Sequence, residues 1–169
     1  MTPERAGCEL SAPVPLNQNH DLSHFDCGKP LLNDWLRQRA LKNEGRASRC
    51  FVMCAGQMVR GYYCLVAGAV QHSDVPSALK RNMPSSIPVV IIGRMGVDLS
   101  LQGRGIGGAL LKDALLRTIA ASESIGVRAV MVHAIDEAAV PFYAQYGFQP
   151  FPHGTLTLFL PIDKIIGQV

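Results

Sequence analysis

The chain has 169 residues, 48% of them hydrophobic, and a mean hydropathy of +0.16, which predicts one compact domain over residues 1–169. The formal net charge of +3 is too small to indicate an acidic partner by itself. No apolar run is long enough to cross a membrane, and the first residues lack the apolar core of a signal peptide. We therefore expect a cytoplasmic protein that makes no contact with a membrane.

The first half of the chain predicts one helix and one hairpin. A short strand is expected over residues 9–12, and a helix over 30–43 with a leucine-rich apolar side. Two apolar strands are expected over 50–55 and 58–69, with a glycine between them. A long polar loop without regular secondary structure is expected over 70–87.

The second half alternates strands and helices. A β-branched strand over 88–97 leads through a glycine-rich turn into an amphipathic helix over 106–124. A buried strand over 127–134, a short helix over 137–146 and a last strand near 155–160 follow. This order predicts an α/β fold, in which helices cover the faces of a mixed sheet.

The five cysteines, at positions 8, 27, 50, 54 and 64, do not form a metal-binding pattern. Cys50 and Cys54 have no histidine or cysteine pair at the spacing of a zinc site. Several of the cysteines fall in apolar strands. We therefore expect reduced thiols in the core and no bound metal.

The glycine-rich turn is the clearest candidate binding site. Glycines at 103, 105, 107 and 108 leave backbone N–H groups uncovered, and the start of a helix adds unpaired donors and a positive dipole end. Such a turn is suited to phosphate. The dinucleotide fingerprint fits poorly, because its third glycine is displaced, and the Walker pattern is absent. A purely structural turn is the alternative.

Two motifs resemble those of the GNAT acetyltransferases. Residues 102–107 read Gln-x-x-Gly-x-Gly, like the pyrophosphate loop of that family, and residues 142–148 read Phe-Tyr-x-x-x-Gly-Phe. The resemblance implies a GNAT fold, a mixed sheet splayed at an acetyl-CoA site with helices on both faces, and acetyl-CoA as co-substrate without a metal. The acetyl-CoA contacts it implies are Met95, Gly96, Val97, Gln102, Gly103, Arg104, Gly105, Ile106, Gly107 and Gly108.

Other segments are similar to one branch of that family, the tRNA-acetylating toxins of type II toxin–antitoxin systems. Residues 25–28 read Phe-Asp-Cys-Gly and residues 81–84 read Arg-Asn-Met-Pro. This resemblance implies an aminoacyl-tRNA substrate, a ribbon-helix-helix antitoxin, operator DNA bound through that antitoxin, and a homodimer. The chain departs from the branch at 77–80, where an arginine run is usual, and at 95–96, where Met-Gly replaces Leu-Ala.

The resemblance places the catalytic role on Tyr143. A phenol is protonated at neutral pH, so it can donate a proton to a departing thiolate whose ordinary pKa is about 8.5. The strand over 89–97 contains no acid that would serve as a base, which favours an α-amine over the more basic lysine amine. Two interpretations of His133 stay open, a base acting through water and a structural residue. For Tyr143, the alternative to a catalytic role is that its ring only packs in the core.

Basic side chains gather in two stretches, and together with the resemblance they predict contacts with tRNA phosphates. An ordinary solvated surface is the alternative for the helical ones. A runner-up function is acetylation of a protein N-terminus, a lysine or a small amine, and a non-enzymatic alternative is a co-repressor of the antitoxin's operon. The predicted tRNA contacts are Arg37, Arg39, Lys42, Arg46, Arg49, Lys80 and Arg81.

Overall fold

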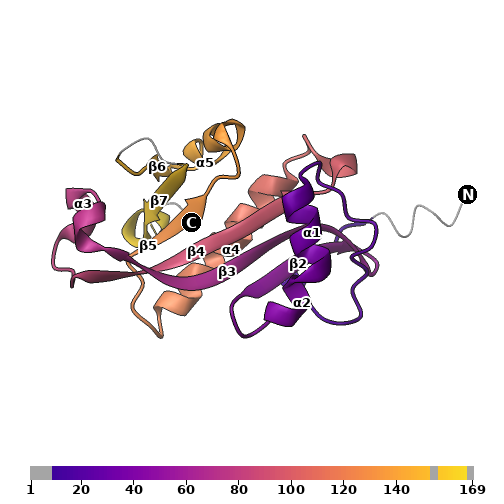
Figure 1. Cartoon of the computed structure of the whole chain (residues 1–169), viewed down its shortest axis with the longest axis horizontal. Coiled ribbons are helices and arrows are strands. Elements are labelled where there is room, and N and C mark those ends of the chain that lie inside the picture. Colours follow the sequence, from indigo (N-terminus) through magenta and orange to yellow (C-terminus); the bar gives the residue numbers. More distant parts are fainter. Residues whose placement is uncertain (1–8, 153–155, 167–169) are drawn as a thin grey trace, which may run out of the picture. The chain divides into compact units, whose positions relative to one another are not determined.

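Seven strands form a mixed sheet in the hydrogen-bonded order β1-β2-β3-β4-β5-β7-β6, which confirms the predicted α/β class (Figure 1). The structure is a computed structural model that describes residues 9–152 and 156–166. The chain divides into two units, Met1–Leu65 with Arg94–Ala114 and Val66–Gly93 with Leu115–Val169.

An antiparallel hairpin is the centre of the first unit. β2 (Arg49–Ala55) pairs with β3 (Met58–Gln71), so that Cys50 lies opposite Cys64. Gly56 makes the turn with a φ of +63°, a conformation that glycine adopts without steric cost. The short strand β1 (Val14–Pro15) pairs with the outer edge of β2. The predicted hairpin is therefore confirmed.

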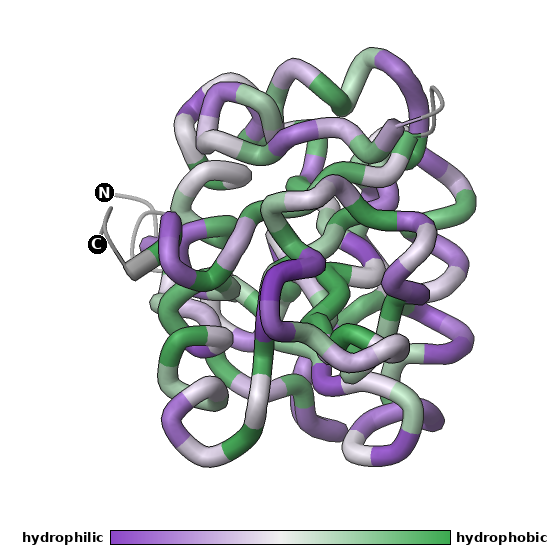
Figure 2. Tube along the Cα trace, turned by 90° about the vertical axis from the view of Figure 1, so that its left-hand side faces the viewer, coloured by the Kyte–Doolittle hydropathy of each residue, from purple (hydrophilic) through white to green (hydrophobic). Residues whose placement is uncertain are grey.

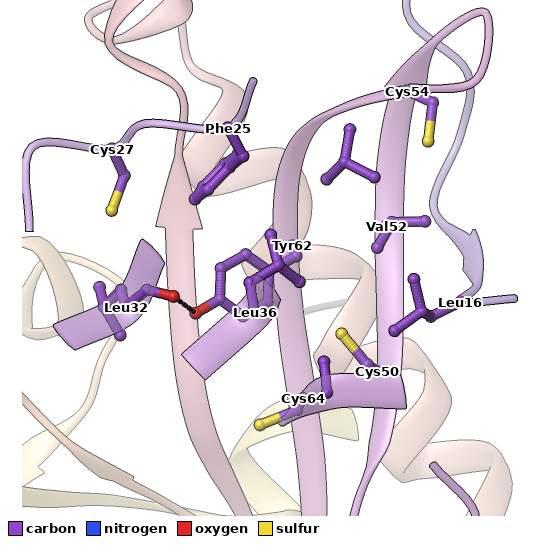
Figure 3. Packing of buried hydrophobic residues seen from close by; sticks show 12 residues of the cluster. Leu16, Phe25, Cys27, Leu32, Leu36, Cys50, Val52, Cys54, Tyr62 and Cys64 are labelled. Atoms are coloured by element: carbon purple, nitrogen blue, oxygen red, sulfur yellow. Dashed lines mark hydrogen bonds between the residues drawn. The ribbon is translucent and has the colours of Figure 1, made fainter. Parts of the chain in front are cut away.

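Two helices, α1 (Pro30–Gln38) and α2 (Ala40–Asn43), pack their apolar residues against this hairpin. Tyr62 from β3 is fully buried, and its hydroxyl donates a hydrogen bond of 2.8 Å to the carbonyl of Leu32 in α1 (Figure 3). Its ring stacks on that of Trp35, with centroids 6.1 Å apart. Burial of large side chains and a satisfied phenol thus hold helix and sheet together.

Four cysteines are free and buried, namely Cys27, Cys50, Cys54 and Cys64, as the sequence predicts. Burial raises the pKa of Cys50 and of Cys54, so both stay protonated thiols that behave as small apolar groups. Cys8 lies outside the described residues. Within the ranges that the structure describes, no cluster of side chains suited to a metal is found.

β4 (Ser86–Val97) runs through both units, and so does α4 (Ile106–Ser122). A 3₁₀ turn over Leu99–Leu101 follows β4 and leads into the glycine-rich turn. In the second unit, β4 pairs in parallel with β5 (Ala129–His133) over the register Val89↔Ala129 to Ile92↔Val132.

The rest of the second unit completes the sheet. β5 pairs antiparallel with β7 (Thr157–Pro161), and β7 pairs with β6 (Gln149–Pro150). Hydrophobic and hydrophilic residues alternate along much of the chain trace (Figure 2). The helical elements are η2 (His72–Asp74), α3 (Ser77–Lys80), η4 (Glu137–Ala139), α5 (Val140–Ala144) and α6 (Ile162–Ile166).

Several predicted boundaries were wrong. The strand expected over 9–12 lies at Val14–Pro15, an edge strand of two residues in which proline is tolerated, and only an isolated bridge forms at Leu10. The helix expected over 30–43 breaks at Arg39, whose backbone leaves the helical conformation. The polar loop over 70–87 contains α3.

Other elements were missed or are shorter than predicted. The helix expected over 137–146 is one 3₁₀ turn followed by the five-residue α5. The sequence pattern gave no signal for β6 or α6, each of five residues or fewer. Among the described residues, no helix has the length and hydropathy needed to span a membrane.

Candidate active site

The glycine-rich turn is exposed and held in conformations that favour glycine. Gly103 and Gly105 both have a φ of +78°, and an added Cβ at either would meet nothing within 4 Å. The first hydrogen bond of α4 runs from Ala109 N–H to the Gly105 carbonyl at 3.1 Å. The N–H groups that precede it in the helix have no intrahelical partner, and they lie at the positive end of a 17-residue helix. This geometry is suited to a phosphate group.

The predicted acetyl-CoA contacts Met95, Gly96 and Val97 form the end of β4, beyond the stretch that pairs with β5. The Val97 carbonyl is not free, because it accepts a hydrogen bond of 2.9 Å from the Gln102 side chain. A Cβ added to Gly96 would lie 3.4 Å from Cys27, Phe25 and Tyr62. The position that departs from the family pattern therefore faces the core of its own unit.

Gln102 and Arg104 differ in their surroundings. The Gln102 amide nitrogen donates to the carbonyls of Val97 and Cys27, so its donors are already bound within the protein. Arg104 is exposed. Ile106, Gly107 and Gly108 form the first turn of α4 and are half-buried, and their backbone N–H groups precede the first hydrogen bond of the helix.

Tyr143 lies in α5 of the second unit. Its ring packs edge-on against Phe142 and Phe148, with centroid distances of 5.0 and 5.8 Å. Burial raises the pKa of Tyr143 to about 12. Tyr143 is therefore a protonated phenol at neutral pH, suited to act as a proton donor.

His133 is exposed at the end of β5, and its Nδ1 lies 2.9 Å from the Thr157 hydroxyl. It lines a cavity of about 440 Å³ within the second unit, together with Met131, Phe151 and Gln71. The residue is thus accessible to small molecules and is not buried within the strand.

The predicted basic contacts fall into two sets, one in each unit. In the first unit, Arg37 donates to the Phe25 carbonyl and pairs with Asp34 at 3.8 Å, and Arg49 pairs with Glu44 at 3.6 Å. Three more cations are exposed there and have no carboxylate partner among the described residues, namely Arg39, Lys42 and Arg46. In the second unit, Lys80 ends α3 and Arg81 follows it, exposed.

Arg94 is a basic residue that the sequence reasoning missed. Its guanidinium lies over the Trp35 ring, 4.6 Å from the centroid, and it is exposed. No ion pair involves it within the described ranges. Its signal in the sequence was a single charge in an otherwise apolar strand, one residue before Met95. A stacked cation of this kind is suited to an anionic ligand.

Comparison with known proteins places this geometry in a family. Residues 46–150 match the model of the acetyltransferase (GNAT) domain. A protein of Mycobacterium tuberculosis named tRNA-acetylating toxin is 44% identical over 151 residues, which cover 89% of this chain and 91% of that protein. A probable toxin TacT of Sinorhizobium fredii is 34% identical over 164 residues, with the same coverage of 89% and 91%.

Solved structures agree with these sequence matches. AtaT complexed with acetyl-methionyl-tRNAfMet superposes with a TM-score of 0.87 at 30% identity, covering 95% of this chain and 99% of that one. A tyrosine-to-phenylalanine variant of the AtaT toxin, bound to the C-terminus of the antitoxin AtaR and to acetyl-CoA, gives 0.82 at 29% identity, with coverage of 95% and 97%. A KacTA–DNA complex gives 0.80 at 26% identity, covering 95% and 98%. The chain belongs to the GNAT family of acetyltransferases.

Proposed function

We propose that this protein transfers the acetyl group of acetyl-CoA to the α-amine of an aminoacyl-tRNA and so acts as the toxin of a toxin–antitoxin pair. The observation that carries the proposal is the 44% identity, over 89% of the chain, to a protein named tRNA-acetylating toxin. The exposed glycine turn and the protonated Tyr143 supply the local chemistry that such a reaction needs. An acetylated amine cannot accept a growing peptide, so translation stops.

The proposed reaction balances without a metal. The neutral amine attacks the thioester carbonyl, a C–N bond forms, and the C–S bond breaks as the thiolate leaves. Tyr143 gives its proton to that thiolate and regains one from solvent, while the amine releases its proton to water. An α-amine with a pKa of about 7.7–8.0 is partly neutral already, so a strong base is not required.

Asp98, the acid at the end of β4, is unsuited to act as the base. Burial would raise the pKa of this carboxylate, but hydrogen bonds from Ser100 and from the Asp26 N–H lower it below its ordinary value. Arg60 also pairs with it at 3.5 Å. A carboxylate held in its charged form by these partners accepts a proton poorly. His133 is the accessible candidate for a base acting through water.

The basic residues of the first unit, with Arg94 added to them, support contact with RNA phosphates. Arg39, Lys42 and Arg46 are exposed cations, and Arg94 is held on an aromatic ring. Phosphate contacts of this kind fix orientation on the RNA and carry no sequence information themselves. We propose that Arg37 and Arg49 of the first unit also contact tRNA, and that Lys80 and Arg81 of the second unit do so as well.

The relatives' assemblies extend the proposal to partners. AtaT has been solved with the C-terminus of its antitoxin, and a KacTA complex has been solved with DNA. For this protein we propose a ribbon-helix-helix antitoxin, operator DNA bound through that antitoxin, a homodimer, and action in the cytoplasm. Co-purification of the antitoxin and the mass of the complex in solution test the first and the third of these.

The deciding experiment uses labelled acetyl-CoA with charged tRNA, the same tRNA after removal of its amino acid, and a protein extract. The wild type runs beside Tyr143→Phe, with Tyr146→Phe as matched control, because Tyr146 is an exposed tyrosine three residues further along the chain. Label on charged tRNA alone, lost in the first variant and kept in the second, supports the proposal. Label on protein instead favours the runner-up function, and no label in any arm favours the co-repressor.

A further inference from the structure

The segment Phe25–Gly28 is tied to the glycine-rich turn by hydrogen bonds within the first unit. The Gln102 side-chain nitrogen donates to the Cys27 carbonyl at 3.0 Å and to the Val97 carbonyl at 2.9 Å. Leu99 N–H donates to the Asp26 carbonyl at 2.8 Å. One amide group therefore joins the segment before α1, the end of β4 and the start of the turn.

Asp98 provides a second connection between the same parts of the chain. Its carboxylate accepts from the backbone N–H of Asp26 at 3.1 Å and from the N–H and hydroxyl of Ser100 at 3.0 and 2.7 Å. Its own N–H donates to the Arg60 carbonyl at 2.8 Å. Only 5% of Asp98 is exposed, so these partners are what allow a buried carboxylate there.

Asn33 fixes the other side of the segment from α1. Its Nδ2 donates to the Asp26 carboxylate at 2.9 Å, and its Oδ1 accepts from Cys27 N–H at 2.9 Å. Gly28 N–H donates to the same Asp26 oxygen at 2.9 Å. Asn33 is buried with both ends of its amide satisfied, so the segment has one well-defined conformation.

The turn beyond Gln102 has little support of its own. Gly103 and Gly105 are exposed glycines with open space around the position of a Cβ, and glycine has more conformational freedom than any other residue. A binding loop that must be ordered on binding loses affinity, whereas one held in its bound conformation does not. The hydrogen bonds on the N-terminal side of the turn are therefore placed where they would hold it ready for a ligand.

We propose that Asn33, Asp26 and Gln102 are positioning residues that hold the glycine-rich turn in the conformation that receives the pyrophosphate of CoA. The inference rests on the proposed use of acetyl-CoA and goes beyond it, because none of these side chains has to touch the ligand. It also gives the Phe-Asp-Cys-Gly motif a role. The motif is part of the acetyl-CoA site through the backbone that it supports.

The test compares two acetyl donors that differ in the pyrophosphate. Acetyl-CoA contains it, and S-acetyl-pantetheine lacks it. Gln102→Met removes the two donated hydrogen bonds without adding charge, and we expect kcat/KM for acetyl-CoA to fall about tenfold, the loss of one to two hydrogen bonds. The rate with S-acetyl-pantetheine should not change. Titration calorimetry with CoA should show the same tenfold loss of affinity in the absence of tRNA.

A second variant separates positioning from direct contact. Asn33→Asp keeps the oxygen that accepts from Cys27 N–H, but it replaces the NH₂ group that donates to Asp26 with a second oxygen. Residue 33 lies on α1 and not in the glycine-rich turn. We expect the same selective loss for acetyl-CoA. Gln57→Met is the matched control, because Gln57 is exposed in the hairpin turn. This substitution should change the rate with neither acetyl-CoA nor S-acetyl-pantetheine. Thermal unfolding establishes that each variant is folded.

Several results would overturn the proposal. An equal loss with both donors would mean general damage to the site, and no loss would mean that the hydrogen bonds do not hold the turn. A loss in Gln102→Met without one in Asn33→Asp would mean that Gln102 acts by touching CoA. Because CoA binding is measured without tRNA, these outcomes are independent of whether tRNA is the acceptor.

Discussion

Replacing Gly105 with alanine separates backbone strain from ligand binding. Gly105 has a φ of +78°, and an added Cβ would meet nothing within 4 Å, so the substitution adds strain without a clash. A left-handed conformation costs a non-glycine residue about 1–2 kcal/mol. For a chain of this size, we expect a melting temperature lower by about 2–4 °C per kcal/mol.

Binding should suffer more than stability. If the turn relaxes to relieve the strain, its N–H groups rotate away from the phosphate, and each lost hydrogen bond to a charged group costs about 1.5–3 kcal/mol. The dissociation constant for CoA should therefore rise at least about tenfold, since 1.4 kcal/mol corresponds to a factor of ten. Titration calorimetry with CoA and thermal unfolding measure the two effects separately.

The hairpin provides the control for this substitution. Gly56 has a φ of +63° and equally open surroundings, but it lies in the turn between β2 and β3. Gly56→Ala should lower the melting temperature by a similar amount and leave CoA affinity unchanged. The reasoning is refuted if folded Gly105→Ala binds CoA within about twofold of the wild type, or if Gly56→Ala weakens CoA equally.

Four further predictions follow from the site. Tyr143→Phe should lower kcat by about 10²–10⁴, and because the pKa of Tyr143 is about 12, the wild-type pH–rate profile should show no loss from its ionisation below about pH 11. Gly96→Ala should keep the KM for acetyl-CoA, because the new Cβ makes ordinary contacts at 3.4 Å, and a large rise in KM would contradict this. Arg94→Gln should weaken the binding of aminoacylated and uncharged tRNA alike, and it should reduce the slope of log K against log salt concentration by about one phosphate contact. Filter binding over a series of salt concentrations measures both effects. Hydrogen bonds from Gly28 and Asn33 lower the pKa of Asp26 in the folded protein. The ionised carboxylate therefore stabilises the fold above its pKa in the unfolded chain, near 4, and this stabilisation is lost as the pH falls through its pKa in the folded protein. The melting temperature should fall correspondingly in acid, and Asp26→Asn should remove this part of the fall.

Local patterns predicted the parts of the molecule that depend on neighbours in sequence. The glycines after β4, the hairpin around Gly56 and the buried cysteines all lie where the sequence indicates, because turn chemistry and apolar runs are local signals. The break at Arg39 has no proline or glycine to mark it. The position of β1 at Val14–Pro15 could not be predicted either, because proline lacks the N–H of a regular ladder and argues against a strand there.

The support of the glycine turn was not predictable from the sequence. Gln102 and Cys27 are 75 positions apart, and Asp26 and Asp98 are 72 apart, so only the fold brings them together. Periodicity places a residue on a face of its own element and says nothing of such pairings. Arg94 was missed for the same reason, because its partner Trp35 lies in another element. The exposure of His133 at a cavity likewise depends on residues from β3 and β7.

The most direct test of the central claim identifies the atom that receives the acetyl group. Charged tRNA is incubated with acetyl-CoA and the protein, digested with nuclease, and the terminal aminoacyl-adenosine is analysed by mass spectrometry with fragmentation. We expect one acetyl group on the α-amine of the amino acid, absent from the reaction with Tyr143→Phe. An unmodified aminoacyl-adenosine beside acetylated protein or free amine would contradict it.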